Sequence, residues 1–221
     1  MTTFSARFRS LADPSETYGL TEVVYRDRKG GLLEVAHDTA AWSSRTAGDW
    51  RTLFASRPDS GVWAQREWVQ PHVAPENVIS LGEGHSPLLP GRGYGGKLGL
   101  DRLFIKQCGT SHTGSFKDLG MTVLVSSVKQ AIAEGRPIRA IACASTGDTS
   151  AALAAYGAAA GIPVVVLLPA GKVSPAQLVQ PLAHGALVAA LDTDFDGCTS
   201  CAGDTLPAGS STTTGIPAAA P

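Results

Sequence analysis

The clearest pattern along the chain is an alternation of apolar strands and amphipathic helices that begins near residue 103. Four short apolar runs have the composition of strands: 103–107, 139–143, 163–168 and 186–192. Between the first two runs, helical spacing places these apolar residues of 118–134 on one face: Met121, Leu124, Val125, Val128 and Ile132. Because strand and helix alternate through four strands, the pattern predicts an α/β fold, with a doubly wound parallel sheet and right-handed crossovers.

Two more helices are expected within this alternation. An alanine-rich helix over 148–160 should end at Gly161, because glycine readily adopts the left-handed conformation that closes a helix. The motif Ser174–Gln177 combines an N-cap serine, a proline at the first helical position and a glutamine three residues after the cap, which predicts a helix start. We expect Pro181 to kink that helix or end it early.

The two ends of the chain depart from this alternation. Residues 1–78 hold all four tryptophans, and we interpret them as an N-terminal extension whose aromatic side chains pack within the protein. Residues 79–198 form the main domain, with a three-layer α/β core at about 102–195 and an incomplete second domain. Residues 199–221 are almost entirely Thr, Ala, Ser, Gly and Pro, so we expect a disordered low-complexity tail.

Composition excludes several classes of partner. The formal net charge is −1, so the chain has no basic surplus with which to bind nucleic acid. No run of eighteen apolar residues predicts a membrane span, and the N-terminus lacks the apolar core of a signal peptide. Four cysteines in an otherwise ordinary chain are interpreted as reduced thiols. These features predict a cytoplasmic protein, or a plastid protein if the source is a plant or alga.

Candidate chemistry gathers in two loops. Lys117 lies among small residues in 111–120, after the first strand, as Schiff-base chemistry at a lysine requires. The loop 145–149 joins the second strand to the alanine-rich helix. Its backbone N–H groups and three hydroxyls suit a carboxylate or phosphate, although an ordinary capped turn is the alternative. In parallel sheets such loops meet at the carboxyl ends of the strands.

Together with Gly82–Leu88 upstream, these two motifs resemble threonine synthases of the branch with a long N-terminal extension. Those are pyridoxal 5′-phosphate (PLP) enzymes of fold type II, the tryptophan-synthase-like fold, and the similarity runs from about residue 17 to residue 198. Threonine dehydratases and cysteine synthases share the lysine and the glycine-bearing turn. They usually carry Pro at the position of His112 and Arg at that of Leu119.

The resemblance implies a lyase that converts O-phosphohomoserine and water into threonine and phosphate, the last step of threonine biosynthesis. Lys117 would hold PLP and then act as a general base at the α-carbon. Phe116 would either shape the cofactor slot or pack in the core. Asp148 would contact the cofactor where most relatives have Asn; because an ionised carboxylate only accepts hydrogen bonds, it must be protonated, act through water or act differently. The implied substrate-binding residues are Ser145, Thr146, Gly147 and Thr149.

The resemblance also implies S-adenosylmethionine as an effector bound by the N-terminal extension, and a homodimer in the full-length family. Relatives are longer and carry a glycine-rich phosphate loop that is not found after Cys198. We therefore expect a C-terminally truncated chain that is inactive or nearly so on its own. Two alternatives stay open: another fold type II lyase of the threonine dehydratase kind, and a non-catalytic partner or S-adenosylmethionine-binding module.

Two weaker motifs are discounted. The run Gly91–Gly96 satisfies the dinucleotide pattern G-x-G-x-x-G, but it precedes a predicted strand, so we interpret it as a flexible loop. Cys198-x-x-Cys201 has no second pair with metal-ligand spacing, so we interpret it as a coincidence and expect no metal site.

Overall fold

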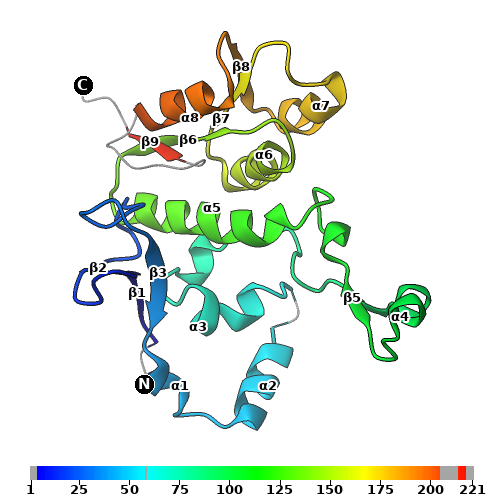
Figure 1. The fold of residues 1–221 in the computed structure, drawn as a ribbon. Helices are drawn as coiled ribbons and strands as arrows, with labels where there is room; N and C mark the ends of the chain where they lie inside the picture. Colours follow the sequence, from blue (N-terminus) through cyan, green and yellow to red (C-terminus); the bar gives the residue numbers. More distant parts are fainter. Residues whose placement is uncertain (1–3, 58, 205–213, 218–221) are drawn as a thin grey trace.

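The N-terminal region contains a small antiparallel sheet. The structure is a computed structural model that describes residues 4–57, 59–204 and 214–217 (Figure 1). The sheet has the order β2-β1-β3 and consists of β1 (Ala6–Ser10), β2 (Thr17–Tyr18) and β3 (Leu33–His37). Ser10 donates a 2.6 Å hydrogen bond to the buried carboxylate of Asp27, which also accepts from the backbone N–H of Gly31. These bonds hold the connection between β2 and β3 against the sheet.

Short helices follow the sheet and carry the tryptophans. They are α1 (Thr39–Trp42), α2 (Ala47–Ala55), α3 (Arg66–Val69) and the 3-10 turns η1 (Trp63–Gln65) and η2 (Pro75–Asn77). A capping box between Thr46 and Asp49 starts α2. The ring of Trp50 packs against those of Phe54 and Trp68, with centroids 5.5 Å and 5.2 Å away. Trp50 and Trp63 are each 6% exposed, so the packing interpretation of these two tryptophans is confirmed.

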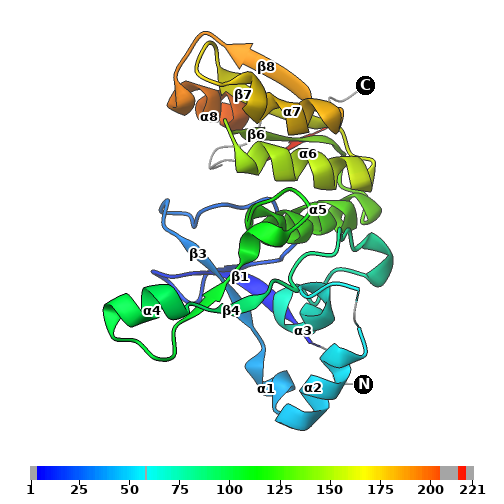
Figure 2. The same ribbon diagram turned by 90° about the vertical axis from the view of Figure 1, so that its right-hand side faces the viewer.

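A parallel sheet forms the centre of the second region. Its strands β6 (Ile138–Ala144), β7 (Val164–Pro169) and β8 (Leu187–Leu191) are neighbours in the order β8-β7-β6. One face is covered by α6 (Asp148–Ala160) and α7 (Pro175–Ala183), and α5 (Lys117–Ala133) packs on α6. The helix α8 (Phe195–Asp204) packs on β6 and β7 from the other face, as Figures 1 and 2 show. The predicted α/β class with a parallel sheet is confirmed.

The edge of this sheet differs from the prediction. The run 103–107, predicted as its first strand, lies elsewhere: β5 (Phe104–Lys106) pairs antiparallel with β4 (Leu88–Pro90). The fourth strand of the main sheet is instead β9 (Thr214–Pro217), which is antiparallel to β6. The sheet is therefore mixed, with three parallel strands. Phe104 and Ile105 are about half exposed, which shows that an apolar run alone does not identify the sheet that a strand joins.

The region expected to be a disordered tail also differs where it is described. Residues 199–204 belong to α8 and 214–217 form β9, whereas the remainder of 199–221 lies outside the described residues. Within α8, Cys198 and Ala202 are one helical turn apart and both are buried. Contacts of this helix with the sheet therefore order residues whose composition alone predicts disorder.

Two local predictions need correction. The glycine-rich run Gly91–Gly96 is not a loop: it follows β4 and begins α4 (Arg92–Leu98), where Gly95 donates a 2.7 Å hydrogen bond to the Gly91 carbonyl. Pro181 does not end its helix early, since α7 continues to Ala183. The capping box of Ser174 and Gln177 at the start of α7 is confirmed.

The core lies between α6 and the parallel sheet. Residues 150–157 of α6 are all buried, and the alanines and the glycine among them let the helix approach the strands closely. A Cβ on Gly157 would stand 2.2 Å from a methyl group of Val164, so the packing at this point requires glycine. Gly161 ends α6 in the predicted left-handed conformation, with φ of 70°.

A buried carboxylate joins the N-terminal region to α6. Glu83 is 1% exposed and accepts hydrogen bonds from the hydroxyls of Tyr156 at 2.7 Å and Ser60 at 2.8 Å. The chain around Ser60 crosses the chain around Glu83 so closely that a Cβ on Gly61 would stand 2.4 Å from the carbonyl carbon of Gly84. The segments before and after residue 78 therefore form one packed body around α5 and α6.

Candidate active site

Lys117 is the first residue of α5 and is preceded by a tightly hydrogen-bonded loop. The Thr113 N–H and hydroxyl both donate to the carboxylate of Asp118, with the N–H bond at 2.9 Å. The Ser111 hydroxyl donates to the Ser115 carbonyl at 2.6 Å, and the Lys117 N–H donates to the Ser115 hydroxyl at 3.2 Å. These contacts fix the backbone from which the lysine side chain projects. We call residues 111–116 the lysine loop.

The amine of Lys117 lies close to the aromatic ring of its neighbour. Its Nζ is 4.8 Å from the centroid of the Phe116 ring, within the range of a cation–π contact. Phe116 is 58% exposed, so its alternative role as a core residue is wrong. The ring instead forms an apolar surface beside the half-buried lysine. Such a surface suits a planar cofactor ring, in agreement with the slot-shaping role that the resemblance implies.

The second loop caps the start of α6. The Ser145 hydroxyl oxygen accepts from the N–H groups of Gly147 at 3.3 Å and Ser150 at 3.2 Å. Asp148 is the first residue of α6 and is exposed, and Thr146 and Thr149 flank it as half-buried residues. The first N–H groups of a helix have no acceptor within it, so this loop presents donors at a positive helix end. An anionic group is the ligand that these donors suit.

The fold brings both loops to one end of the parallel sheet. The helix α5 runs into β6 and α6 runs out of it, so both helices begin beside the carboxyl end of that strand. Figures 1 and 2 show that α5 and α6 pack against each other. Residues 145–149 thus lie at the carboxyl end of β6, as the parallel-strand rule predicts. Lys117 reaches this end only because α5 leads into β6, since the strand before it, β5, lies outside the parallel sheet.

Sequence reasoning missed two polar residues at this site. Asp118 is fully buried and closes the lysine loop through Thr113. Gln180 of α7 donates from Nε2 to the Thr113 carbonyl at 3.2 Å. The position of Asp118 directly after the lysine was a usable signal, because a carboxylate beside a loop of hydroxyls and N–H groups often caps it. The contact of Gln180 spans 67 residues and had no local signal.

The cysteines take no part in this arrangement. Burial raises the pKa of the Cys143 thiol to about 12, so it stays protonated at neutral pH. The structure has no disulfide among the four cysteines, all of which lie within the described residues. Across residues 4–57, 59–204 and 214–217, no cluster of His, Cys, Asp or Glu side chains has the arrangement of a metal site.

The residues present fit PLP. An amine at the end of an ordered loop can bond covalently to the cofactor aldehyde, and the Phe116 ring lies beside that amine. Gly114, with φ of +83°, has open space where a side chain would stand, which leaves the loop uncrowded. Lys117 would hold the cofactor, Phe116 would face its ring, and the N-terminus of α6 would bind an anionic group of cofactor or substrate.

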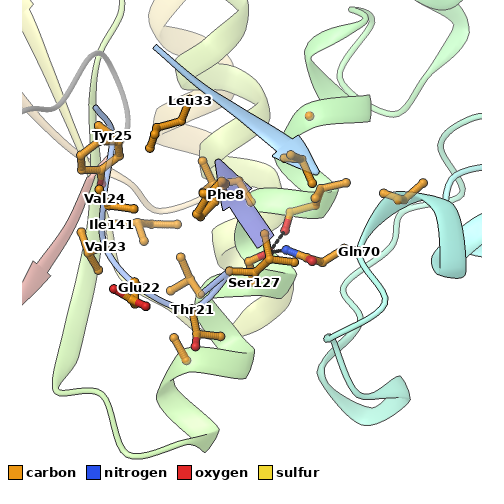
Figure 3. Close-up of a pocket in the computed structure, with 18 of the residues that line it drawn as sticks. Phe8, Thr21, Glu22, Val23, Val24, Tyr25, Leu33, Gln70, Ser127 and Ile141 are labelled. Atoms are coloured by element: carbon orange, nitrogen blue, oxygen red, sulfur yellow. Dashed lines mark hydrogen bonds between the residues drawn. The ribbon is translucent and has the colours of Figure 1, made fainter. Parts of the chain in front are cut away.

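A large cavity lies at a different place. It has a volume of about 670 Å³ and lies between the N-terminal sheet and the middle of α5 (Figure 3). Apolar residues from both sides line it, among them Phe8, Leu33, Val128 and Ile141. Its only ionisable residues among the described lining, apart from the phenol of Tyr25, are Glu22 and Glu34. This cavity is distinct from the lysine loop.

Curated proteins with a similar sequence carry the name threonine synthase. The curated "Threonine synthase 2, chloroplastic" of Arabidopsis thaliana is 50% identical over 199 residues, which cover 86% of this chain and 39% of that protein. The threonine synthase of Methanosarcina acetivorans is 42% identical over 180 residues, covering 81% of this chain and 41% of its own. The chain thus spans about two fifths of the length of these curated relatives.

Solved structures support the fold. The PLP-bound threonine synthase of Brucella melitensis has a TM-score of 0.59 at 17% identity, over 89% of this chain and 43% of that one. The threonine synthase of Escherichia coli has a TM-score of 0.57 at 19% identity, over 88% and 44%. At these identities the likeness shows the fold alone. The family model described as "Pyridoxal-phosphate dependent enzyme" matches residues 79–210, more than half of the chain, so the chain belongs to the family of PLP-dependent enzymes.

Proposed function

We propose that this chain carries the lysine-bearing part of a threonine synthase, which converts O-phosphohomoserine and water into threonine and phosphate. The observation that carries the proposal is the meeting of Lys117 and the 145–149 loop at one end of the sheet, in a chain 50% identical to a curated threonine synthase. A lysine amine beside a helix N-terminus suits an amino acid substrate that carries a carboxylate and a phosphate.

Each residue has a role that its surroundings support. Lys117 would hold the cofactor through Nζ, and the freed Nζ amine would take up the proton from the substrate α-carbon. When bound, PLP supplies a ring that withdraws electrons from the substrate. The N–H groups that begin α6 bind the substrate carboxylate. Ser145 accepts two backbone N–H groups, so its own hydroxyl proton is available for donation to the same carboxylate.

Asp148 and its neighbours orient the bound groups. Asp148 is exposed at the first position of α6. As an ionised carboxylate it accepts hydrogen bonds, so it binds a donor of the cofactor or an intervening water molecule. Thr146, Gly147 and Thr149 complete the substrate-binding loop.

A chimaera tests this function. The chain would replace the matching 199-residue segment of the Arabidopsis relative, and phosphate release from O-phosphohomoserine would be measured with PLP present. We expect release by the chimaera, loss of release on Lys117→Ala, and no 2-oxobutyrate from threonine. Formation of 2-oxobutyrate without phosphate release would support the dehydratase alternative, and release that persists in Lys117→Ala would overturn the proposal.

The cavity of Figure 3 favours a second function, effector binding. We propose that it accepts S-adenosylmethionine, since its wall is apolar and the carboxylate of Glu22 suits a sulfonium cation, whereas that of Glu34 is ion-paired with Arg9 at 2.6 Å. Isothermal titration should show binding that Val35→Trp, which fills the cavity, abolishes. The matched control Leu32→Trp changes an exposed residue outside the described lining and should leave binding intact. No heat at millimolar ligand would end this proposal.

Assembly and location remain part of the same proposal. We propose a homodimer for the complete protein, to be tested by sedimentation equilibrium. The chloroplastic location in the name of the Arabidopsis relative supports a plastid for a plant or algal source, and a cytoplasmic location otherwise. No helix in the described part of the chain is both long and apolar enough to cross a membrane.

A further inference from the structure

One face of α7 meets both loops of the candidate site. Gln180 donates from Nε2 to the carbonyl of Thr113 in the lysine loop, at 3.2 Å. Gln177 lies one turn earlier, and its Nε2 is 4.0 Å from the place where a Cβ on Gly147 would stand. Residues three apart in a helix lie on the same face. The helix α7 is therefore the element that connects the lysine loop to the 145–149 loop.

Thr113 is held from two directions. Its N–H and hydroxyl donate to Asp118, and its carbonyl accepts from Gln180. Asp118 is fully buried and follows Lys117 directly, so the position of Thr113 is tied to the backbone at the lysine. Asp118 of α5 thus holds the N–H and hydroxyl of Thr113, and Gln180 of α7 holds its carbonyl. A shift of α7 would thus change the lysine loop.

We propose that Gln180 is a positioning residue for Lys117. Its amide holds the Thr113 carbonyl and thereby sets the loop that directs the lysine amine toward the cofactor aldehyde. It touches neither cofactor nor substrate and acts through Thr113 and Asp118. The inference deepens the proposed function and rests on it, because it assigns the lysine its cofactor-binding role.

The chain offers a matched pair of variants. Gln180→Glu preserves size but replaces the donor by an acceptor, which cannot bind a carbonyl when ionised. Gln177→Glu makes the same change one turn earlier on the same helix and keeps the side-chain oxygen that accepts from the Ser174 N–H and hydroxyl in the capping box. Both positions are exposed, so both variants should fold and add the same charge. Gln180→Arg restores a donor and serves as the rescue.

Two readouts on the full chain test the inference. Amide hydrogen exchange of residues 111–117 should rise about 2- to 10-fold in Gln180→Glu, the range for one lost hydrogen bond. Borohydride trapping of PLP on Lys117, measured by mass spectrometry, should slow by a similar factor. Gln177→Glu should match the wild type in the exchange of residues 111–117, and Gln180→Arg should recover both readouts. The midpoint of thermal unfolding should fall by no more than about 6 °C in Gln180→Glu, the loss that corresponds to the same hydrogen bond.

The outcomes separate this inference from the proposed function. Unchanged exchange in Gln180→Glu, an equal rise in both glutamate variants, or faster exchange with unchanged trapping would overturn the positioning role. Amide hydrogen exchange requires no cofactor, so it tests whether Gln180 holds the lysine loop even if the wild type traps no PLP. In that event the proposed function fails by itself, and the rate of Lys117 acetylation replaces trapping as the readout of the amine.

Discussion

Tyr156→Phe tests the link between the N-terminal region and the helix that carries the 145–149 loop. The substitution removes one hydroxyl and leaves the ring of a fully buried side chain in place. The lost hydroxyl donates to Glu83 Oε2 at 2.7 Å. Glu83 keeps three other donors, which are the hydroxyls of Ser60 and Ser80 and the N–H of Leu81. The variant therefore measures one hydrogen bond to a buried carboxylate.

The magnitude follows from the charge and the burial of the acceptor. A hydrogen bond to a charged group contributes about 1.5–3 kcal/mol to the free energy of unfolding, and little solvent reaches Glu83 to replace it. For a chain of this length, about 2–4 °C of melting temperature corresponds to 1 kcal/mol. We therefore expect Tyr156→Phe to lower the melting temperature by about 3–12 °C at neutral pH.

The effect should depend on pH at both extremes. Burial acts to raise the pKa of Glu83, but hydrogen bonds from Tyr156, Leu81 and Ser60 outweigh it and hold that pKa below its usual value. The stability from Glu83 is thus present above its unfolded pKa of about 4.3 and is lost as pH falls through the lower folded pKa. Burial, followed by the hydrogen bond and charge of Glu83, raises the pKa of Tyr156. Its contribution should therefore decline above about pH 10, where an unfolded tyrosine ionises.

The assay is urea and thermal unfolding of wild type and variant between pH 3 and pH 10.5, a range chosen around these reference pKa values of about 4.3 and 10. Tyr94→Phe is the matched control, because it deletes the same hydroxyl from a side chain that is 62% exposed, and we expect a change below about 0.5 kcal/mol. A Tyr156→Phe variant as stable as Tyr94→Phe, or a stability difference that stays constant down to pH 3, would refute the reasoning.

Three further substitutions test the packing around the site. Gly61→Ala should destabilise the chain by about 1–3 kcal/mol or more in urea unfolding, because its Cβ would stand 2.4 Å from the Gly84 carbonyl carbon. The control Gly93→Ala places a methyl group in open space within α4 and should not destabilise the chain. Trp63→Phe should cost about 1–3 kcal/mol, because it removes the 2.7 Å hydrogen bond to a buried threonine hydroxyl of α5; an unchanged urea midpoint would contradict this. Asp118→Asn should cost about 1–3 kcal/mol and speed hydrogen exchange across 111–116, since it removes one acceptor from the lysine loop.

Local sequence signals predicted the elements that depend on local chemistry. The capping box at Ser174 and the left-handed Gly161 mark helix ends that the structure confirms. The run 163–168 corresponds to the strand β7, which begins and ends one residue later than predicted. In contrast, the run at 103–107 begins with three apolar residues but pairs with β4 outside the main sheet, and its own residues do not indicate that partner.

The candidate site divides in the same way. Lys117 and the 145–149 loop were predicted at one edge because parallel strands share a polarity. The rule holds for the loop after β6, but the strand before Lys117 lies in the antiparallel pair of β4 and β5, so the position of Lys117 follows from α5 leading into β6. The partners of Glu83 lie 23 and 73 residues away, and the contact of Gln180 spans 67. Hydrogen bonds over such separations depend on the tertiary fold, so no sequence period indicates them.

The most direct test of the central claim is the site of covalent PLP attachment. The chain has six lysines, and the account assigns the cofactor to one of them. After incubation with PLP and borohydride reduction, peptide mass spectrometry should find the adduct on Lys117, and Lys117→Ala should abolish it. An adduct spread evenly over the exposed lysines, or one that persists in Lys117→Ala, would contradict the account.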